Sequence, residues 1–195
     1  MRLLGNLSKG IFFVVSAPAG TGKNTLVNLL KEEFPCVIES ISYTTRKPRK
    51  GEVHGREYFF VSEEEFLRKV KLGEFLEHAK VFGSYYGTPN KEIFEQRETG
   101  HHVVLVIDTQ GALSIKGKVP AVFIFIKPPS VEAIHIRLQT RNTETKESME
   151  ERLSWMNKEI EASVHYDYQI INEDLIIAYQ VLRSIVIAEE HKVVK

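Results

Sequence analysis

The sequence predicts an α/β fold in which a mostly parallel sheet carries helices on both faces. Four short apolar runs indicate buried strands, at 11–15, Val103–Ile107, Ala121–Ile126 and Tyr168–Ile171. Apolar residues at helical spacing separate these runs, at Thr25–Glu33, Val131–Thr140, Ser148–His165 and Leu175–Glu190. Strands that alternate with helices in this way are typical of βαβ units, which build parallel sheets.

The composition is that of an ordinary globular protein with one core. Among its 195 residues, 26 Lys and Arg balance 26 Asp and Glu, so no net charge draws the chain to nucleic acid or to a membrane surface. No apolar run approaches the roughly 18 residues of a membrane span. The single cysteine, Cys36, fits a reducing compartment. We therefore expect a soluble cytoplasmic protein, a monomer or small homo-oligomer, without nucleic-acid or membrane partners.

The first strand leads through a loop of small residues into a helix. Gly20 and Gly22 lack a Cβ, so the loop can turn its backbone N–H groups toward an anion. The helix N-terminus adds partial positive charge, and Lys23 adds a full charge for the β- and γ-phosphates. This arrangement predicts a nucleotide-phosphate site, with a plain strand-to-helix turn as the alternative. The expected ATP-binding residues of the loop are Ala17, Pro18, Ala19, Gly20, Thr21, Gly22, Lys23, Asn24 and Thr25.

The loop departs from the P-loop pattern G-x-x-x-x-G-K-[ST] at two positions. Ala17 replaces the first glycine, and Asn24 replaces the hydroxyl residue that binds Mg²⁺. We expect Mg²⁺ to accompany ATP, held by Asn24, by the neighbouring Thr25, or wholly through water.

The region 39–99 interrupts the alternation of strands and helices. It carries short β-prone pieces, such as Tyr58–Val61, among Gly, Pro, Arg and Tyr residues, which predicts a small mixed subdomain inserted into the parent fold. Within it, Arg46 and Arg49 flank Pro48 in a stretch that cannot be regular helix. Paired guanidinium groups bind phosphate through bidentate hydrogen bonds. The alternative is a solvated basic loop.

Local signals predict the ends of several helices. Ser62 before three glutamates indicates a capped first turn, and Ser130 after two prolines is a natural N-cap. Ser148 with Glu151 forms a capping box. On the last helix, the apolar stripe within Leu182–Val186 is expected to face the core.

Several motifs, in their order along the chain, resemble those of the guanylate kinases. They are Ser16–Lys23, Ser42–Arg46, Gly51–Gly55 with Tyr58, Gly73–Ala79, Gly83–Thr88 and Ile107–Gly111. The likeness extends over about residues 10–189. It implies a P-loop NTPase core with a parallel sheet flanked by helices, an inserted GMP-binding subdomain of mixed α/β structure, and a mobile lid. As one domain of residues 1–195, the core would comprise 1–38 and 100–195, the subdomain 39–99 and the lid about 137–152.

The resemblance implies transfer of a phosphoryl group from ATP to GMP, with dGMP as a further acceptor. Arg46, Arg49, Tyr58 and Tyr86 would bind the GMP phosphate, with Ser42 close by. Glu77, Thr88 and Asp108 would recognise guanine, whose N1–H and N2–H₂ donors suit a carboxylate. Adenine lacks this pair of donors, so a buried Glu77 would discriminate against AMP.

The resemblance also assigns residues to ATP and to the transferred group. Arg137, Arg141 and Arg152 match arginines of the lid and its neighbouring helix, and Asn172 matches a position near the adenine. With Lys23 and Arg46, these three arginines form the expected catalytic set.

Two points in the sequence leave alternatives open. Val106 stands where the family often has a carboxylate near the metal, which puts the strength of Mg²⁺ binding in doubt. A catalytically inactive guanylate-kinase-like module that binds protein is the rival from another class, although such modules typically lose the P-loop lysine. A P-loop enzyme with another acceptor is a third reading.

Overall fold

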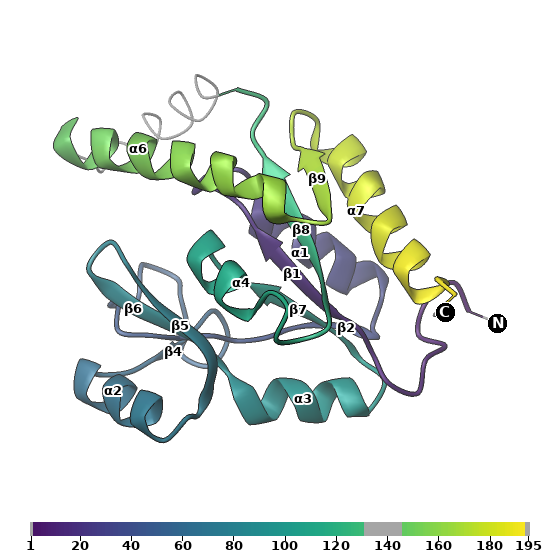
Figure 1. Ribbon diagram of the computed structural model, residues 1–195, viewed down its shortest axis with the longest axis horizontal. Coiled ribbons are helices and arrows are strands. Elements are labelled where there is room, and N and C mark those ends of the chain that lie inside the picture. Colours follow the sequence, from purple (N-terminus) through teal and green to yellow (C-terminus); the bar gives the residue numbers. More distant parts are fainter. Residues whose placement is uncertain (1, 131–145, 194–195) are drawn as a thin grey trace.

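The computed structural model describes residues 2–130 and 146–193, with the backbone alone for 146–153. A five-stranded parallel sheet forms the centre, in the order β2-β7-β1-β8-β9 (Figure 1). Its strands are β1 (Phe12–Ser16), β2 (Val37–Glu39), β7 (His102–Val106), β8 (Ala121–Lys127) and β9 (Tyr168–Ile171). The predicted α/β class and parallel sheet are confirmed.

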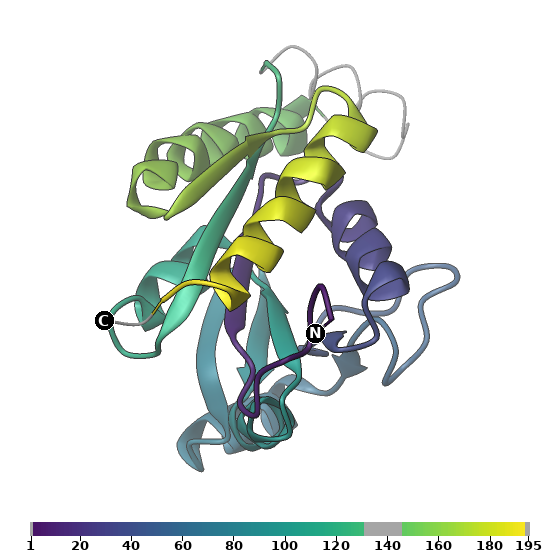
Figure 2. The ribbon, with the colours of Figure 1, turned by 90° about the vertical axis from the view of Figure 1, so that its right-hand side faces the viewer.

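The sheet is covered on both faces because successive side chains of its strands point to opposite sides. Phe13 and Val15 of β1 pack with residues of α1 (Lys23–Glu33) and α7 (Leu175–Glu190). Phe12 and Val14 pack on the other face with residues of α3 (Asn90–Glu98) and α4 (Thr109–Ile115). Figure 2 shows α1 and α7 together on one side of the sheet. Helix α6 (Lys146–Ala162) is followed by a 3₁₀ turn at Ser163–His165.

A second sheet of four strands, in the order β4-β3-β6-β5, lies within the segment predicted as an insert. Its strands are β3 (Tyr43–Thr44), β4 (Phe59–Phe60), β5 (Phe75–Val81) and β6 (Ser84–Pro89), with α2 at Glu63–Lys71. Phe66 of α2 is fully buried against Phe75 and Tyr85, with ring centroids 4.7 and 5.4 Å away. This aromatic layer is a small core of its own. The domain boundaries near 39 and 99 stay a prediction.

Most of the predicted elements are confirmed, with shifts of one or two residues at their ends. The Ser62 hydroxyl accepts a hydrogen bond from the Glu65 N–H at 3.1 Å, as the capping signal predicts. The capping box at Ser148 is wrong, because α6 already includes Lys146 and places Ser148 inside the helix. The α-helix also ends at Ala162 rather than at residue 165. The helix expected at 131–140, with its Ser130 cap, lies outside the described residues.

The apolar stripe of α7 faces the core as expected, since Leu182 and Val186 are fully buried and Ile185 is nearly so. Among the described residues, no helix combines the length and apolarity needed to cross a lipid bilayer.

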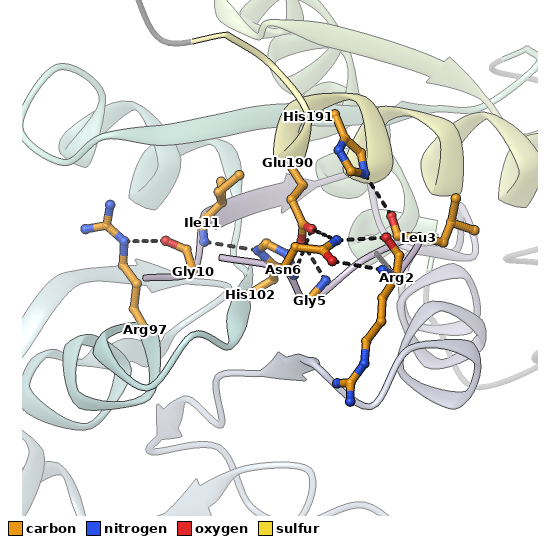
Figure 3. Close-up of polar contacts among 10 residues, drawn as sticks. All are labelled: Arg2, Leu3, Gly5, Asn6, Gly10, Ile11, Arg97, His102, Glu190 and His191. Atoms are coloured by element: carbon orange, nitrogen blue, oxygen red, sulfur yellow. Dashed lines mark hydrogen bonds and ion pairs between the residues drawn. The ribbon is translucent and has the colours of Figure 1, made fainter. Parts of the chain in front are cut away.

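A buried polar clasp joins the N-terminal segment, β7 and α7 (Figure 3). The Glu190 carboxylate accepts hydrogen bonds from the N–H groups of Gly5 and Asn6 at 2.7 and 2.9 Å. His102 Nδ1 accepts from the Ile11 N–H at 3.1 Å, so its Nε2 carries the proton and donates to Glu190 at 2.6 Å. Burial would raise the pKa of Glu190, but these hydrogen bonds outweigh it and lower the pKa to about 2.

We predict that Glu190→Gln lowers the free energy of unfolding at pH 7 by roughly 2–3 kcal/mol. Because the pKa of Glu190 is lower in the folded state, its contribution is present above the unfolded pKa of about 4.5 and is lost as the pH falls toward 2. Urea unfolding at pH 7 and pH 3 measures this, and the variant should lose less stability than the wild type on acidification. Glu98→Gln, which breaks an exposed pair with Lys9, is the control and should change little. Identical pH profiles for Glu190→Gln and the wild type would contradict the assignment.

Candidate functional site

The loop between β1 and α1 is shaped to bind an anion. Gly20 and Gly22 have φ angles of 84° and 87°, in the left-handed region that favours glycine. Gly22 is also the N-cap of α1, and no side chain caps this helix end, so its first N–H groups face the loop without a side-chain acceptor. Such an end attracts phosphate.

Two side-chain hydrogen bonds hold the backbone of this loop in place. The buried Thr21 hydroxyl donates to the Pro18 carbonyl at 2.7 Å. The buried Asn172, directly after β9, donates through Nδ2 to the Thr21 carbonyl at 2.6 Å. A Cβ on Gly22 would lie 2.6 Å from that same nitrogen, so only glycine fits here. Asn172 thus fixes the loop backbone.

Lys23 opens α1 and lines a cavity of about 170 Å³ between the two sheets. Burial lowers the pKa of Lys23, while the charges of Glu159, Asp108 and Glu39 act in the opposite direction. The other residues that line this cavity are Ser42, Tyr58, Glu77, Val81, Tyr86, Val106, Ile107 and Asp108. The structure therefore brings together predicted site residues from six separate motifs of the sequence.

Glu77 is a buried carboxylate on the wall of this cavity, carried by β5. Its side chain accepts a hydrogen bond from the buried Thr88 hydroxyl of β6. Burial raises the pKa of Glu77 to about 7, the Thr88 hydrogen bond opposes this, and the charge of Asp108 adds to it. Within the described ranges no Lys or Arg forms an ion pair with Glu77. It can therefore accept paired N–H donors from a ligand.

Helix α4 approaches Glu77 closely at its first turn. A Cβ on Gly111 would lie 2.5 Å from Glu77 Oε2, so a larger residue would displace the carboxylate. Asp108 caps the same helix, accepting from the Gly111 N–H at 2.9 Å. Glycine at this position lets the two carboxylates share one wall of the cavity.

A larger cavity of about 580 Å³ adjoins the first, and Ser42, Tyr58 and Val106 line both. Arg46 and Arg49 line this larger cavity, and so does Asn24 of α1. The Arg46 guanidinium donates two hydrogen bonds to Glu52, at 2.9 and 3.0 Å. These bonds lower the pKa of Glu52, against the effect of its burial.

Glu52 is one of two site residues that sequence reasoning missed. It also accepts from the Arg49 N–H at 2.7 Å, so it shapes the loop that carries both arginines. The only signal in the sequence was an acidic residue within a basic run. The resemblance included Glu52 in a motif without giving it a role.

Glu159 of α6 is the second site residue that sequence reasoning missed. It is 6% exposed, and burial raises its pKa to about 7, while the charge of Lys23 lowers it and that of Asp108 raises it. Glu159 therefore interacts electrostatically with the loop lysine, Lys23. No signal in the sequence marks Glu159, because charged residues on a helix usually face water.

The remaining predicted residues fall in three groups. Asn24 and Thr25 are exposed at the first turn of α1. Arg152 belongs to α6, but its side chain lies outside the description. Arg137 and Arg141, with most of the predicted lid, fall outside the described residues altogether. The roles given to all the predicted site residues stay predictions.

The chain matches known proteins along nearly its whole length. The family described as Guanylate kinase matches residues 9–189. Guanylate kinase of Protochlamydia amoebophila is 55% identical over 195 residues, covering 100% of this chain and 99% of that protein. Guanylate kinase of Chlamydia trachomatis is 50% identical over 181 residues, covering 92% and 88%. The crystal structure of guanylate kinase from Anaplasma phagocytophilum aligns with a TM-score of 0.79 at 38% identity, covering 94% of this chain and 88% of that one.

The raised pKa of Glu77 predicts a stability change with a definite sign. A carboxyl whose pKa is about 7 when folded and 4.5 when unfolded stabilises the fold below pH 4.5, and this stabilisation is lost as the pH rises through 7. Glu77→Gln should therefore gain roughly 2–3 kcal/mol of unfolding free energy over the wild type between pH 5 and pH 8. Urea unfolding at both pH values measures the gain. Glu95→Gln, at an exposed position on α3, is the control and should show no such gain. If the difference in unfolding free energy between Glu77→Gln and the wild type were the same at both pH values, the raised pKa of Glu77 would be contradicted.

Proposed function

Since this chain belongs to the guanylate kinase family, we propose that it transfers the γ-phosphoryl group of ATP to GMP, giving ADP and GDP, with dGMP as a further acceptor. One observation carries the proposal: Lys23 of the phosphate loop and the buried Glu77 line the same cavity. Transfer requires donor and acceptor to be aligned, and this cavity is lined both by a cation for phosphate and by a carboxyl group that accepts hydrogen bonds when ionised.

Guanine recognition follows from the burial of Glu77. The carboxylate would accept hydrogen bonds from N1–H and N2–H₂ of guanine together. The hydrogen bond from Thr88 would orient the carboxylate, and Asp108 lines the same cavity. AMP offers no such donor pair, so it would leave a buried carboxylate without a partner. The fixed geometry of β5 and β6 supports this role, because the two strands are paired on both sides of Glu77.

The GMP phosphate would lie at the boundary of the two cavities. Arg46 and Arg49 would bind its oxygens, with the hydroxyls of Tyr58, Tyr86 and Ser42 close by. Glu52 now neutralises Arg46, and it pre-orients the guanidinium in the absence of ligand. A phosphate dianion would compete with Glu52 for the same donors.

ATP would place its phosphates in the loop 17–25, with Lys23 at the β- and γ-phosphates. The transferred group would be bound by Arg137, Arg141 and Arg152, and the adenine would lie near Asn172. The hydrogen bond from Asn172 to the Thr21 carbonyl supports a second role for Asn172, which is to position the phosphate loop. Asn24 and Thr25, exposed at the first turn of α1, offer oxygen atoms to Mg²⁺, which would be held mainly through phosphate and water. Bound Mg²⁺ would neutralise charge on the β- and γ-phosphates.

The residues present support direct transfer without a covalent intermediate. The acceptor oxygen belongs to an ionised phosphate, so no strong general base is required. Lys23 and the arginines would supply alignment and charge neutralisation. We also propose that the protein acts in purine nucleotide metabolism in the cytoplasm, as a monomer or small homo-oligomer.

A coupled ADP-release assay with GMP, dGMP, AMP and UMP tests the proposed function. We predict rapid turnover with GMP, slower turnover with dGMP and little with AMP or UMP. Lys23→Ala should abolish turnover while the protein stays folded, because the variant loses the charge at the β- and γ-phosphates. Lys118→Ala, exposed in the loop before β8, should remain fully active. Flat traces with all four acceptors would favour the inactive binding module, and turnover by Lys23→Ala would refute the phosphate site.

Glu77→Gln tests guanine recognition separately. We predict that KM for GMP rises roughly 30-fold, since a charge-assisted hydrogen bond is lost and the amide N–H₂ opposes guanine donors. KM for ATP should change less than about twofold, because the P-loop is untouched. Steady-state kinetics with each substrate varied in turn measures both. Equal losses for GMP and ATP would remove Glu77 from guanine recognition.

A further inference from the structure

Helix α7 is apolar on two opposite sides. On the inner side, Leu182 and Val186 are fully buried in the core. On the outer side, Ile177 and Val181 are 62% and 41% exposed. The helix forms the right-hand border of the molecule in Figure 1, and in Figure 2 it lies in front of the sheet. A helix that is apolar all round is normally buried, so the exposed side indicates a surface that another protein covers.

Four residues on the outer side of α7 follow one another along the helix, and we call them the outer stripe: Ile177, Val181, Ser184 and Ala188. Their intervals of four, three and four residues are those at which one helix packs along another in a coiled coil. All four line a groove of about 390 Å³, together with Tyr168 of β9. The two larger side chains lie toward the N-terminal end of α7 and the two small ones toward its C-terminal end. The spacing therefore favours a second helix as the occupant of this surface.

The outer stripe carries no charge. The charged residues of α7 are Arg183, Glu189 and Glu190. Arg183 donates a hydrogen bond to Glu33 of α1 at 2.7 Å. Glu189 accepts a hydrogen bond from the Tyr168 hydroxyl at 2.6 Å, and Glu190 belongs to the buried clasp. Because none of these residues belongs to the stripe, an identical copy can meet it without bringing like charges together.

The sizes of the stripe residues suit a two-fold contact with a second copy of the chain. In such a contact, residue i of one chain meets residue j of the other, and j meets i. If the two α7 helices run antiparallel, Ile177 lies opposite Ala188 of the second copy, and Val181 lies opposite its Ser184. A larger side chain then meets a small one at every level of the stripe. Parallel helices would place the large residues against each other and leave gaps between the small ones.

Charges at the two ends of α7 favour the same antiparallel arrangement. Glu173 and Asp174 are exposed just before the helix, and Lys192 is exposed shortly after its end. Antiparallel packing brings the two acidic residues of one copy near Lys192 of the other. It also places the positive N-terminal end of each helix dipole beside the negative C-terminal end of the other. Opposite charges thus meet at both ends of the stripe.

We propose that the outer stripe is the interface of a two-fold dimer of this chain, in which the two α7 helices pack antiparallel. Strand β9 is the edge of the sheet beside this helix, but its four residues offer few hydrogen bonds to a second copy. The residues that line the two cavities of the candidate site come from other parts of the described chain than α7. The dimer therefore does not depend on the proposed function.

Sedimentation equilibrium of the wild type over a range of concentrations tests the dimer. We expect a dissociation constant of roughly 1–100 µM, as suits a small apolar interface. Val181→Glu and Ser184→Lys should each weaken dimerisation at least about 10-fold, because each buries a charge without a partner. Ser184 is exposed, so its variant keeps the fold, and urea unfolding of dilute protein checks both variants. Val164→Glu, at a residue that is 74% exposed in the 3₁₀ turn, is the control and should dimerise like the wild type.

An equimolar mixture of the Val181→Glu and Ser184→Lys proteins tests the antiparallel arrangement. Antiparallel helices bring the introduced carboxylate of one chain opposite the introduced ammonium group of the other, so the mixture should dimerise more tightly than either variant alone. Parallel helices would bring each introduced charge opposite an unchanged residue, and mixing would then restore nothing.

Three results would overturn the proposal. One is a wild type that stays monomeric throughout the concentration range, which would leave the outer stripe to a different partner. Another is a dimer that neither Val181→Glu nor Ser184→Lys weakens, which would place the interface elsewhere, for example at the edge of β9. The third is a mixture that dimerises no more tightly than its two components, which would exclude antiparallel packing.

Discussion

Parallel strands end at the same edge of a sheet, and this constraint places the chemistry of the protein. Strand β1 is paired on both sides, by β7 and β8, so its position is fixed from the core outward. The segments that leave β1 and β7 at that edge carry Lys23 and Asp108. The small sheet then reaches over the edge and adds Glu77 from β5. The site is therefore assembled where three chain segments converge, on backbone held by a fully buried strand.

The charges in this site are arranged for a ligand rather than for the empty protein. Glu77 and Glu159 are buried, and their pKa values are raised to about 7. Burial also lowers the pKa of Lys23. Each group thus loses hydration that a nucleotide with matching donors or charges would replace. Arg46 is the exception, since Glu52 already accepts two hydrogen bonds from its guanidinium group, and a phosphate would have to compete for these donors.

Much of the fold and part of the candidate site could be predicted from the sequence. The strand, glycine loop and helix around Lys23 were predictable because phosphate binding there depends on local backbone. Glu77 could be assigned only by resemblance, because its burial comes from pairing with β6 and from the close approach of Gly111. Glu159 gave no signal, since helical glutamates normally face water. The clasp between His102 and Glu190 joins residues 88 positions apart, and no local pattern records such a distance. The Ser148 signal failed because Ser-x-x-Glu also occurs within polar helices.

The burial of Glu77 is the central claim, and proton release on GMP binding tests it most directly. Calorimetric titration at pH 7, in two buffers of different ionisation enthalpy, counts the protons released. With a pKa of about 7, part of Glu77 is protonated in the empty protein, and guanine donors require the ionised form. The wild type should therefore release more protons than Glu77→Gln. Equal release from both proteins, or no GMP binding by the wild type, would contradict the account.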